Sequence, residues 1–315
     1  MWGLILAVVV VLPAWVHGEP RSVLYRELNV ASAFDGGGIG FHRQAPPTSV
    51  GFEFFQKYAP GPPGRLSADV LDLYAWLADT PDGQRLEPRI EEAWLRFTDP
   101  GADTEVRIGR FAPPFGLTPT LELRGNPLLP LLELDLGIMR EWGIAVETHA
   151  RDFVYEAATT WTLSDKQRRP GRRALFSARV GVPTFRDVRY ALSALAGTVS
   201  APGDRHVVAW RLAAEAVYHY NEPFTELQAE ASLGADDRRP VWGILGRLSQ
   251  ILPGHPRWQV LAQARRLHRR SVDDEVESAF GVSRSLPYLM TLRVLWLHRA
   301  SAGGVLFTQL HYYAP

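Results

Sequence analysis

Long segments in which apolar and polar residues alternate constrain this chain more than any other feature. In HVVAWRLAAEAVYHY, residues 206–220, every even-numbered position from Val208 to Tyr218 is apolar, while Arg211 and Glu215 occupy odd-numbered positions. Side chains of a β-strand alternate between the two faces of its sheet, so this segment has one apolar face and one face that carries its charges. The pattern predicts a long strand whose two faces meet different environments.

The same alternation recurs along the chain and predicts an all-β fold. Matching segments are residues 23–33, 49–58, 67–78, 91–99, 103–111, 141–149, 152–162, 172–182, 189–199, 206–220, 224–233, 239–250, 257–267, 274–284, 287–297 and 304–314. Turn-forming clusters separate many of them, among them PGPPG at 60–64, ADDRRP at 235–240 and PGHP at 253–256. We therefore expect about 16 antiparallel strands, with a range of roughly 14–18.

Two arrangements fit such a series of strands. In a soluble sandwich the apolar faces form a core and strands have about 5–6 residues. In an outer-membrane barrel strands have about 9–11 residues or more, the apolar face meets lipid, and the charged face lines a wet lumen. Here the strands are long, and aromatic residues lie near the ends of the runs: Trp142, Trp161, Trp242, Trp258, Tyr220, Tyr288, Trp296, Tyr312 and Tyr313. We therefore predict an antiparallel transmembrane β-barrel over residues 19–315, with the soluble sandwich as the alternative.

The first 18 residues, MWGLILAVVVVLPAWVHG, have the form of an export signal. An apolar run from Leu4 to Leu12 leads to Val16-His17-Gly18, which predicts cleavage near Gly18. No later segment is apolar for about 18 residues, so no helical membrane span is expected. Export combined with a barrel predicts a place in the bacterial outer membrane.

Composition excludes several classes of function. The chain carries 34 basic and 34 acidic residues, so we expect no nucleic-acid partner. It contains no cysteine, which rules out disulfides, thiolate metal sites and covalently attached haem. The sequence has no Gly-x-Ser-x-Gly, HExxH or Walker motif, and its histidines lack the spacing of metal ligands. We therefore predict no catalytic residues, no metal, no cofactor and no enzymatic activity.

The segment RIGRFAPPFGL, residues 107–117, begins as a strand but cannot continue as one. Pro113 and Pro114 donate no backbone hydrogen bond to a ladder, and Gly116 permits a sharp turn. The residues up to 140 are too many for a hairpin turn, and NPLLPLLELDL at 126–136 has the start signals of a short helix. We predict that residues 113–140 form a loop that folds into the lumen and constricts it. The alternative is an ordinary external loop.

The region around this segment resembles a known family. EEAWLRFTDPGADTEVRIGRFAPPFGLTPTLELR, residues 91–124, is similar to the corresponding region of bacterial outer-membrane porins of the phosphate-selective type. The matching positions are Ala93, Leu95, Phe97, Gly109, Phe111, Pro114, Phe115 and Gly116, and DLGIMREWGIAVE at 135–147 resembles that family's return into the next strand. The resemblance implies a diffusion pore that forms a homotrimer in outer-membrane lipid. It does not extend to phosphate selectivity, because lysine occurs only at Lys57 and Lys166.

These inferences define the candidate site residues. The constriction is expected to include Arg107, Phe111, Pro114, Phe115, Gly116, Glu122 and Arg124. The wall is expected to direct Arg211, Glu215, Glu226, Glu230, Arg247, Arg265, Glu277 and Arg293 inward. Arg110 is a further candidate near the constriction. It shares the parity of Ile108, however, and can instead point to the membrane interface. The alternative for any one charge is a structural ion pair between strands that touches no solute.

The function predicted from the sequence is passive diffusion of small hydrophilic solutes or ions through an outer-membrane channel. Two alternatives remain at this point: a barrel scaffold or conduit that docks another protein, and a soluble periplasmic β-rich binding protein.

Overall fold

The computed structural model describes residues 20–34, 39–40, 49–58, 66–67, 71–80, 83–99, 103–117, 128, 140–161, 174–183, 186–201, 205–221, 224–269, 272–300 and 303–314. The strands are β1 (Pro20–Phe34), β2 (Ile39–Gly40), β3 (Ser49–Tyr58), β4 (Leu66–Ser67), β5 (Leu71–Thr80), β6 (Gly83–Asp99), β7 (Thr104–Phe111), β8 (Glu141–Ala150), β9 (Phe153–Trp161), β10 (Ala174–Gly181), β11 (Val188–Ala201), β12 (Arg205–Asn221), β13 (Phe224–Asp236), β14 (Arg239–Leu252), β15 (His255–Arg269), β16 (Val272–Leu286), β17 (Met290–Arg299) and β18 (Gly303–Ala314). The described residues contain no helix with the length and apolarity needed to cross a membrane.

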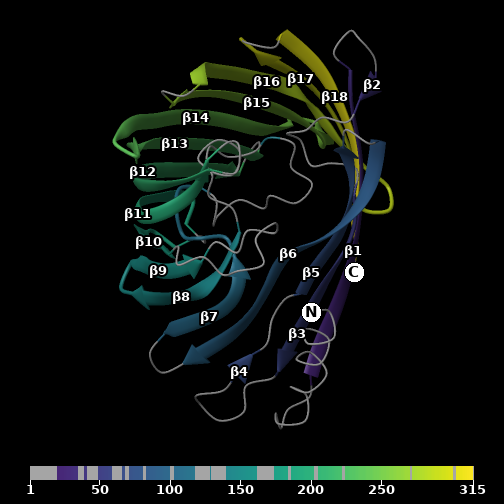
Figure 1. The fold of residues 1–315 in the computed structure, drawn as a ribbon. Helices are drawn as coiled ribbons and strands as arrows, with labels where there is room; N and C mark the ends of the chain where they lie inside the picture. The colour runs from purple at the N-terminus through teal and green to yellow at the C-terminus, as the bar shows by residue number, and fades with distance from the viewer. Residues whose placement is uncertain are drawn as a thin grey trace.

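The strands form one antiparallel ladder that returns to its starting point. β1 pairs with β3 on one side and with β18 on the other, and the remaining long strands pair with their neighbours in chain order. The two-residue strands β2 and β4 pair at the margins of this ring. Apart from them, the described strands form a closed barrel of 16 strands (Figure 1), which confirms the predicted fold class and strand number.

The start of β1 and the end of β18 lie at the same rim of the barrel. Arg26, near the start of β1, is opposite Ala314 at the end of β18. Because the strands alternate in direction, β7 ends at the other rim, at Phe111. We call these the terminal rim and the loop rim.

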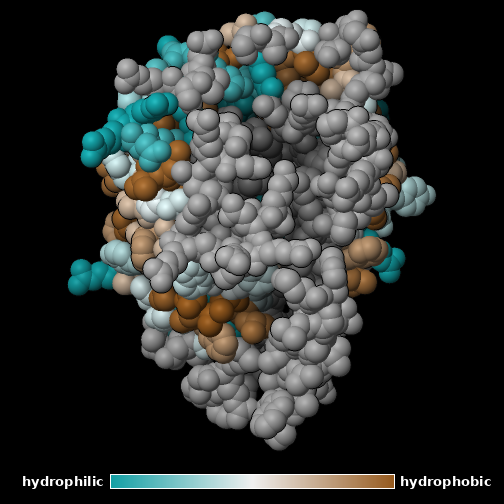
Figure 2. Space-filling model, viewed as in Figure 1, coloured by the Kyte–Doolittle hydropathy of each residue, from teal (hydrophilic) through white to brown (hydrophobic). Residues whose placement is uncertain are grey.

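In the strands whose side chains the structure describes, the apolar face points outward. In β12 the side chains of Val208, Trp210 and Leu212 are 67%, 50% and 49% exposed, whereas Ala209 and Arg211 between them are 2% and 1% exposed. Strands elsewhere in the wall alternate in the same way. Figure 2 shows apolar side chains on the flanks of the wall. The charged side chains thus face the inside of the barrel and the apolar side chains face its outside. A soluble sandwich has the reverse arrangement, so the sandwich alternative is wrong.

Two of the aromatic residues predicted near strand ends have cross-strand neighbours there. Tyr313 has the inward parity of Glu27, to which it is paired, and its ring stacks on Tyr25 with 5.0 Å between centroids. Trp296 lies opposite Leu306 within the β17–β18 ladder, and its indole occupies the space above Gly304. Trp296 is 51% exposed on the outer face near the end of β17, as an interfacial position requires, whereas Tyr313 faces inward and its ring is held by a neighbouring strand.

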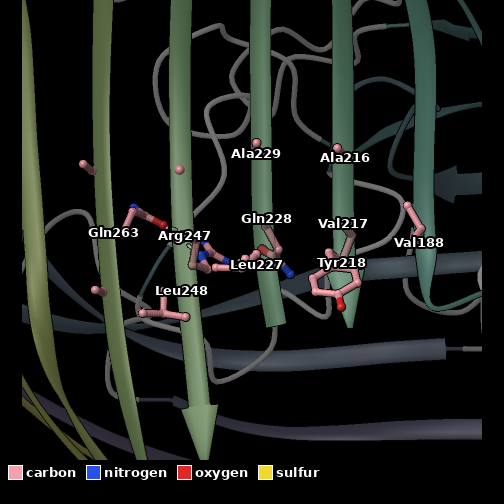
Figure 3. Close-up of a pocket in the computed structure, with 13 residues that line it drawn as sticks. Val188, Ala216, Val217, Tyr218, Leu227, Gln228, Ala229, Arg247, Leu248 and Gln263 are labelled. Atoms are coloured by element: carbon pink, nitrogen blue, oxygen red, sulfur yellow. Dashed lines mark hydrogen bonds between the residues drawn. The ribbon is translucent and has the colours of Figure 1, made fainter. Parts of the chain in front are cut away.

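A shallow apolar hollow of about 520 Å³ interrupts the outer face over β12–β15. Its lining includes a row of small residues, Ala216, Ala229, Gly246 and Ala264, which are direct neighbours across the strands. Tyr218 and Leu248 stand beside this row (Figure 3). A Cβ atom added to Gly246 would meet nothing within 4 Å, so the hollow is open space in the apolar wall.

We expect the purified protein to migrate at two positions on a gel, depending on whether it was boiled in dodecyl sulfate. A closed ladder leaves no strand edge at which detergent can begin to separate the strands, so unfolding at room temperature is slow. The measurement compares unboiled and boiled samples. As a control, a chain that ends before Gly303 lacks β18, cannot close, and should show one position only. Identical mobility of the full chain in both samples would contradict the closed ring.

Candidate functional site

After β7 the chain turns into the barrel. Phe115 and Leu117 are completely buried and form one cluster with inner-face residues of β10, β11, β12, β14 and β15. The wall members are Leu175, Leu195, Val199, Ala209, Ala213, Val217, Val241, Leu245 and Leu267. Pro113 and Pro114 end the β7 ladder because they have no N–H group, and Gly116 adopts a left-handed φ of 57°. The first described part of the predicted loop, residues 113–117, is therefore buried against the inner wall.

Leu128 is a second point of contact between the same loop and the wall. Its side chain is 2% exposed and packs with Leu261, Leu295 and Phe307, among others, on the inner faces of β15, β17 and β18. Arg247 on β14 donates a hydrogen bond from Nη2 to the Leu128 carbonyl oxygen. The two contacts lie on different arcs of the wall.

A ladder of ion pairs crosses the inner face from β6 to β12. Arg107 lies 3.2 Å from Glu105 and 2.9 Å from Glu147. Arg179 lies 2.7 Å from Glu156 and 2.5 Å from Glu215. Arg107 on β7 thus joins a carboxylate of its own strand to one on β8, and Arg179 on β10 joins carboxylates on β9 and β12, so the charges are held on the wall in defined positions.

A second set of inner-face pairs lies on β12–β17. Asp236 accepts from both Arg211, at 2.5 Å, and Arg269, at 2.6 Å. Glu277 is 3.0 Å from Arg265 and 2.6 Å from Arg299. In both cases one carboxylate is shared by two arginines, which is the reverse of the arrangement at Arg107 and Arg179. The inner wall thus carries several separate groups of charges, and each group contains both arginines and carboxylates.

The structure gives a position for most of the residues predicted to form the constriction. Arg107 is on the inner face, and Phe111 is 2% exposed beside Ala145 and Ala158. Pro114, Phe115 and Gly116 are buried in the inward segment. Glu122, Arg124, the helix expected within 126–136 except for Leu128, and the export signal at 1–18 lie outside the described residues.

All eight predicted wall residues are on the inner face. Arg211, Glu215, Glu230, Arg247, Arg265 and Glu277 are buried there, and Glu226 and Arg293 are partly exposed. Most have polar partners within the wall: Glu226 is 3.2 Å from His219, Arg247 donates to Gln263 at 2.7 Å, and Arg293 donates to Gln309 at 2.9 Å. Arg110 has the outward parity of Ile108 and is paired with Trp142, as the alternative interpretation predicted.

Sequence reasoning did not single out Ser193, Arg179 or Asp236, although each contributes to this site. The Ser193 hydroxyl accepts a hydrogen bond from the Gly116 backbone N–H at 3.0 Å. Ser193 and Arg179 occupy inward positions of the predicted strands 189–199 and 172–182. The same alternation that identified Arg211 therefore contained the signal for both. Among the described residues, no three His, Asp or Glu side chains are grouped as metal ligands.

No protein-family model and no curated protein matches this sequence. Solved structures do match its fold. OmpF of Salmonella typhi, in complex with daunomycin, superposes with a TM-score of 0.68 at 10% identity over 93% of this chain and 97% of that chain. OmpT, an outer membrane protein of Vibrio cholerae, in its trimer form, gives 0.67 at 10% identity over 94% and 99%. An anion-selective porin from Comamonas acidovorans gives 0.64 at 12% identity over 94% and 100%. At these identities the likeness shows the fold alone, and that fold is the porin-like β-barrel of bacterial outer membranes.

Proposed function

We propose that this protein is a passive diffusion channel of the bacterial outer membrane for small hydrophilic solutes or ions. The observation that carries the proposal is the inward segment: Phe115 and Leu117 pack inside a closed barrel whose inner face holds charges and whose outer face is apolar. A segment that stands in the lumen narrows it, and the charged groups around it set the local field for solutes. The loop at 113–140 is the proposed constriction, and no catalytic step belongs to this proposal.

The remaining features of the proposal follow from the sequence and from the fold. The export signal at 1–18 is proposed to be cleaved near Gly18, and the mature chain to assemble as a homotrimer in outer-membrane lipid. The trimer is supported by the Vibrio cholerae OmpT structure, which is a trimer form. Phosphate selectivity is not part of the proposal, because the described inner wall groups arginines with nearly as many carboxylates.

We expect the folded protein to produce discrete steps of ion conductance when it is added to a planar lipid bilayer. An aqueous path through the lumen lets salt pass down the applied voltage, so current should rise linearly with salt concentration. The measurement is single-channel recording in potassium chloride with heat-denatured protein as the control. A barrel that inserts, as judged by its shift on boiling, but conducts nothing would favour the scaffold or conduit that docks another protein.

A further inference from the structure

Glu230 on β13 is buried without a cation beside it. Its side chain is 3% exposed, and neither carboxylate oxygen has a hydrogen-bond partner among the described residues. The residue opposite it on β12 is another carboxylate, Glu215, which is held by Arg179 at 2.5 Å. Taking a carboxylate out of water costs free energy unless a partner compensates for its lost hydration. The charge of Arg247 on β14 acts on Glu230 from beyond ion-pair distance, so the neighbouring strands compensate only part of this cost.

A further contribution comes from the tip of the inward segment. The Glu230 carboxylate lies against the backbone at Gly116, and the dipole of the Leu117 N–H favours its charge. The preceding N–H, on Gly116, donates to Ser193 on β11 at 3.0 Å. Buried backbone N–H groups need acceptors, and this segment has left the β7 ladder that would otherwise supply them. Two wall side chains on different strands thus take the place of a partner strand.

Gly116 shows how closely the carboxylate approaches the loop. A Cβ atom built on Gly116 would lie 2.2 Å from Glu230 Oε1, so the carboxylate oxygen occupies the space that any other side chain would need. The φ of 57° at this residue favours glycine independently. Phe115 and Leu117, on either side, are completely buried and keep water away from the contact. A hydrogen bond in such a dry environment is stronger than one in water.

We infer that Glu230 is a positioning residue and not a solute contact: together with Ser193 it clamps residues 115–117 to β11–β13 and so fixes how far the loop stands into the lumen. This inference changes the role expected of Glu230 from its inward parity. It rests on the proposed function only where it concerns conductance, because the clamp itself is a property of the loop and the wall.

The clamp is tested by amide hydrogen exchange of the segment 112–117 in the folded, full-length protein. Glu230→Ala removes the carboxylate that packs against the segment, so exchange at Gly116 and Leu117 should accelerate several-fold. Glu230→Gln keeps a carbonyl oxygen at the same place and should retain most of the protection. Glu226→Ala is the matched control: Glu226 is on the same strand and face but is paired with His219 at 3.2 Å, away from the segment. It should leave the protection of Leu117 unchanged.

Gly116→Ala provides an independent test from the side of the loop. In the wild-type background it should accelerate exchange of the segment, since the new Cβ meets the carboxylate. In the double variant with Glu230→Ala, Gly116→Ala should accelerate exchange by less than it does in the wild-type background. The obstructing oxygen is then gone, and the two changes disrupt one contact. If Glu230→Ala does not fold, Ser193→Ala removes the other acceptor and should deprotect Gly116.

Conductance separates this inference from the proposed function. If the wild type conducts, releasing the segment with Glu230→Ala should change the single-channel conductance, whereas Glu230→Gln should keep it close to that of the wild type. The clamp is wrong if Glu230→Ala and Glu230→Gln alter ion selectivity equally while amide exchange of residues 112–117 stays as in the wild type. Glu230 would then contact solute. If the wild type does not conduct, the proposed function fails, and the exchange experiment still decides the clamp.

Discussion

Arginine at position 229 is expected to lower the free energy of unfolding in a lipid bilayer by about 2–4 kcal/mol, the cost of a cationic side chain at the lipid midplane. Ala229 is exposed on the outer face of β13, between Ala216 on β12 and Gly246 on β14. The apolar hollow leaves room for a longer side chain at this row, so the expected loss comes from desolvation of the charge and not from steric overlap. The measurement is a urea titration of the barrel folded into lipid vesicles.

The matched control is Leu233→Arg on the same strand and face. Leu233 is opposite Trp242, three positions before the end of β13, where an arginine reaches the interface at a cost of about 0–1 kcal/mol. A soluble β protein would place both positions in water and tolerate both arginines equally. Equal stability of the two variants in vesicles would therefore contradict an outer face that meets hydrocarbon.

Replacing Arg179 with alanine should destabilise the barrel by about 3–5 kcal/mol, the cost of breaking a buried ion pair from one side. Arg179 is 8% exposed and is the cation for two carboxylates, Glu156 at 2.7 Å and Glu215 at 2.5 Å. Its loss leaves both carboxylates on the inner wall without their arginine and next to Glu230, which faces Glu215. Urea titration in vesicles measures the loss directly.

Two further variants separate this buried network from ordinary surface charge. Arg186 is also paired with a carboxylate, Asp152, at 3.2 Å, but their side chains are 53% and 79% exposed. Arg186→Ala should therefore change stability by only about 0–1 kcal/mol. Combining Arg179→Met with Glu156→Gln and Glu215→Gln removes the whole charge group and should recover most of the lost stability. If Arg179→Ala is no worse than Arg186→Ala, the inner-wall ladder does not hold the strands together.

The strands could be predicted from the sequence because alternation is a local property. Each of the sixteen predicted segments overlaps one strand of the ring, and the inward parity of Arg211 and Glu215 could be seen within β12 alone. Strand ends were less well determined. β6 begins at Gly83, well before the predicted segment at 91–99, because Pro88 and the charges around it hide the alternation.

Turns show a similar limit. Residues 235–240 contain several turn formers, yet β13 continues to Asp236 and β14 begins at Arg239. The turn consists of Asp237 and Arg238, which have φ values of 45° and 68°. Composition indicates where a turn falls, but it does not tell which two residues adopt the left-handed conformation.

The contacts of the inward segment could not be predicted, because they join residues that no local pattern relates. Parity places Ser193, Glu230 and Arg247 on the inner face, but it says nothing about which of them lies under Gly116 or Leu128. That depends on where Phe115, Leu117 and Leu128 pack, and they pack on two separate apolar clusters.

The seam between β1 and β18 has a consequence for how the protein is made. It places His311 2.8 Å from Glu27, which lies 284 positions earlier in the chain. Contacts between residues so distant in sequence are slow to form, and this one also requires that the C-terminal strand has already been exported. Until β18 arrives, β1 has one neighbour in place of two, and the sheet has open edges that can pair with other chains. The last 12-residue strand therefore completes the wall and, in the same step, ends the period in which the chain is prone to aggregate.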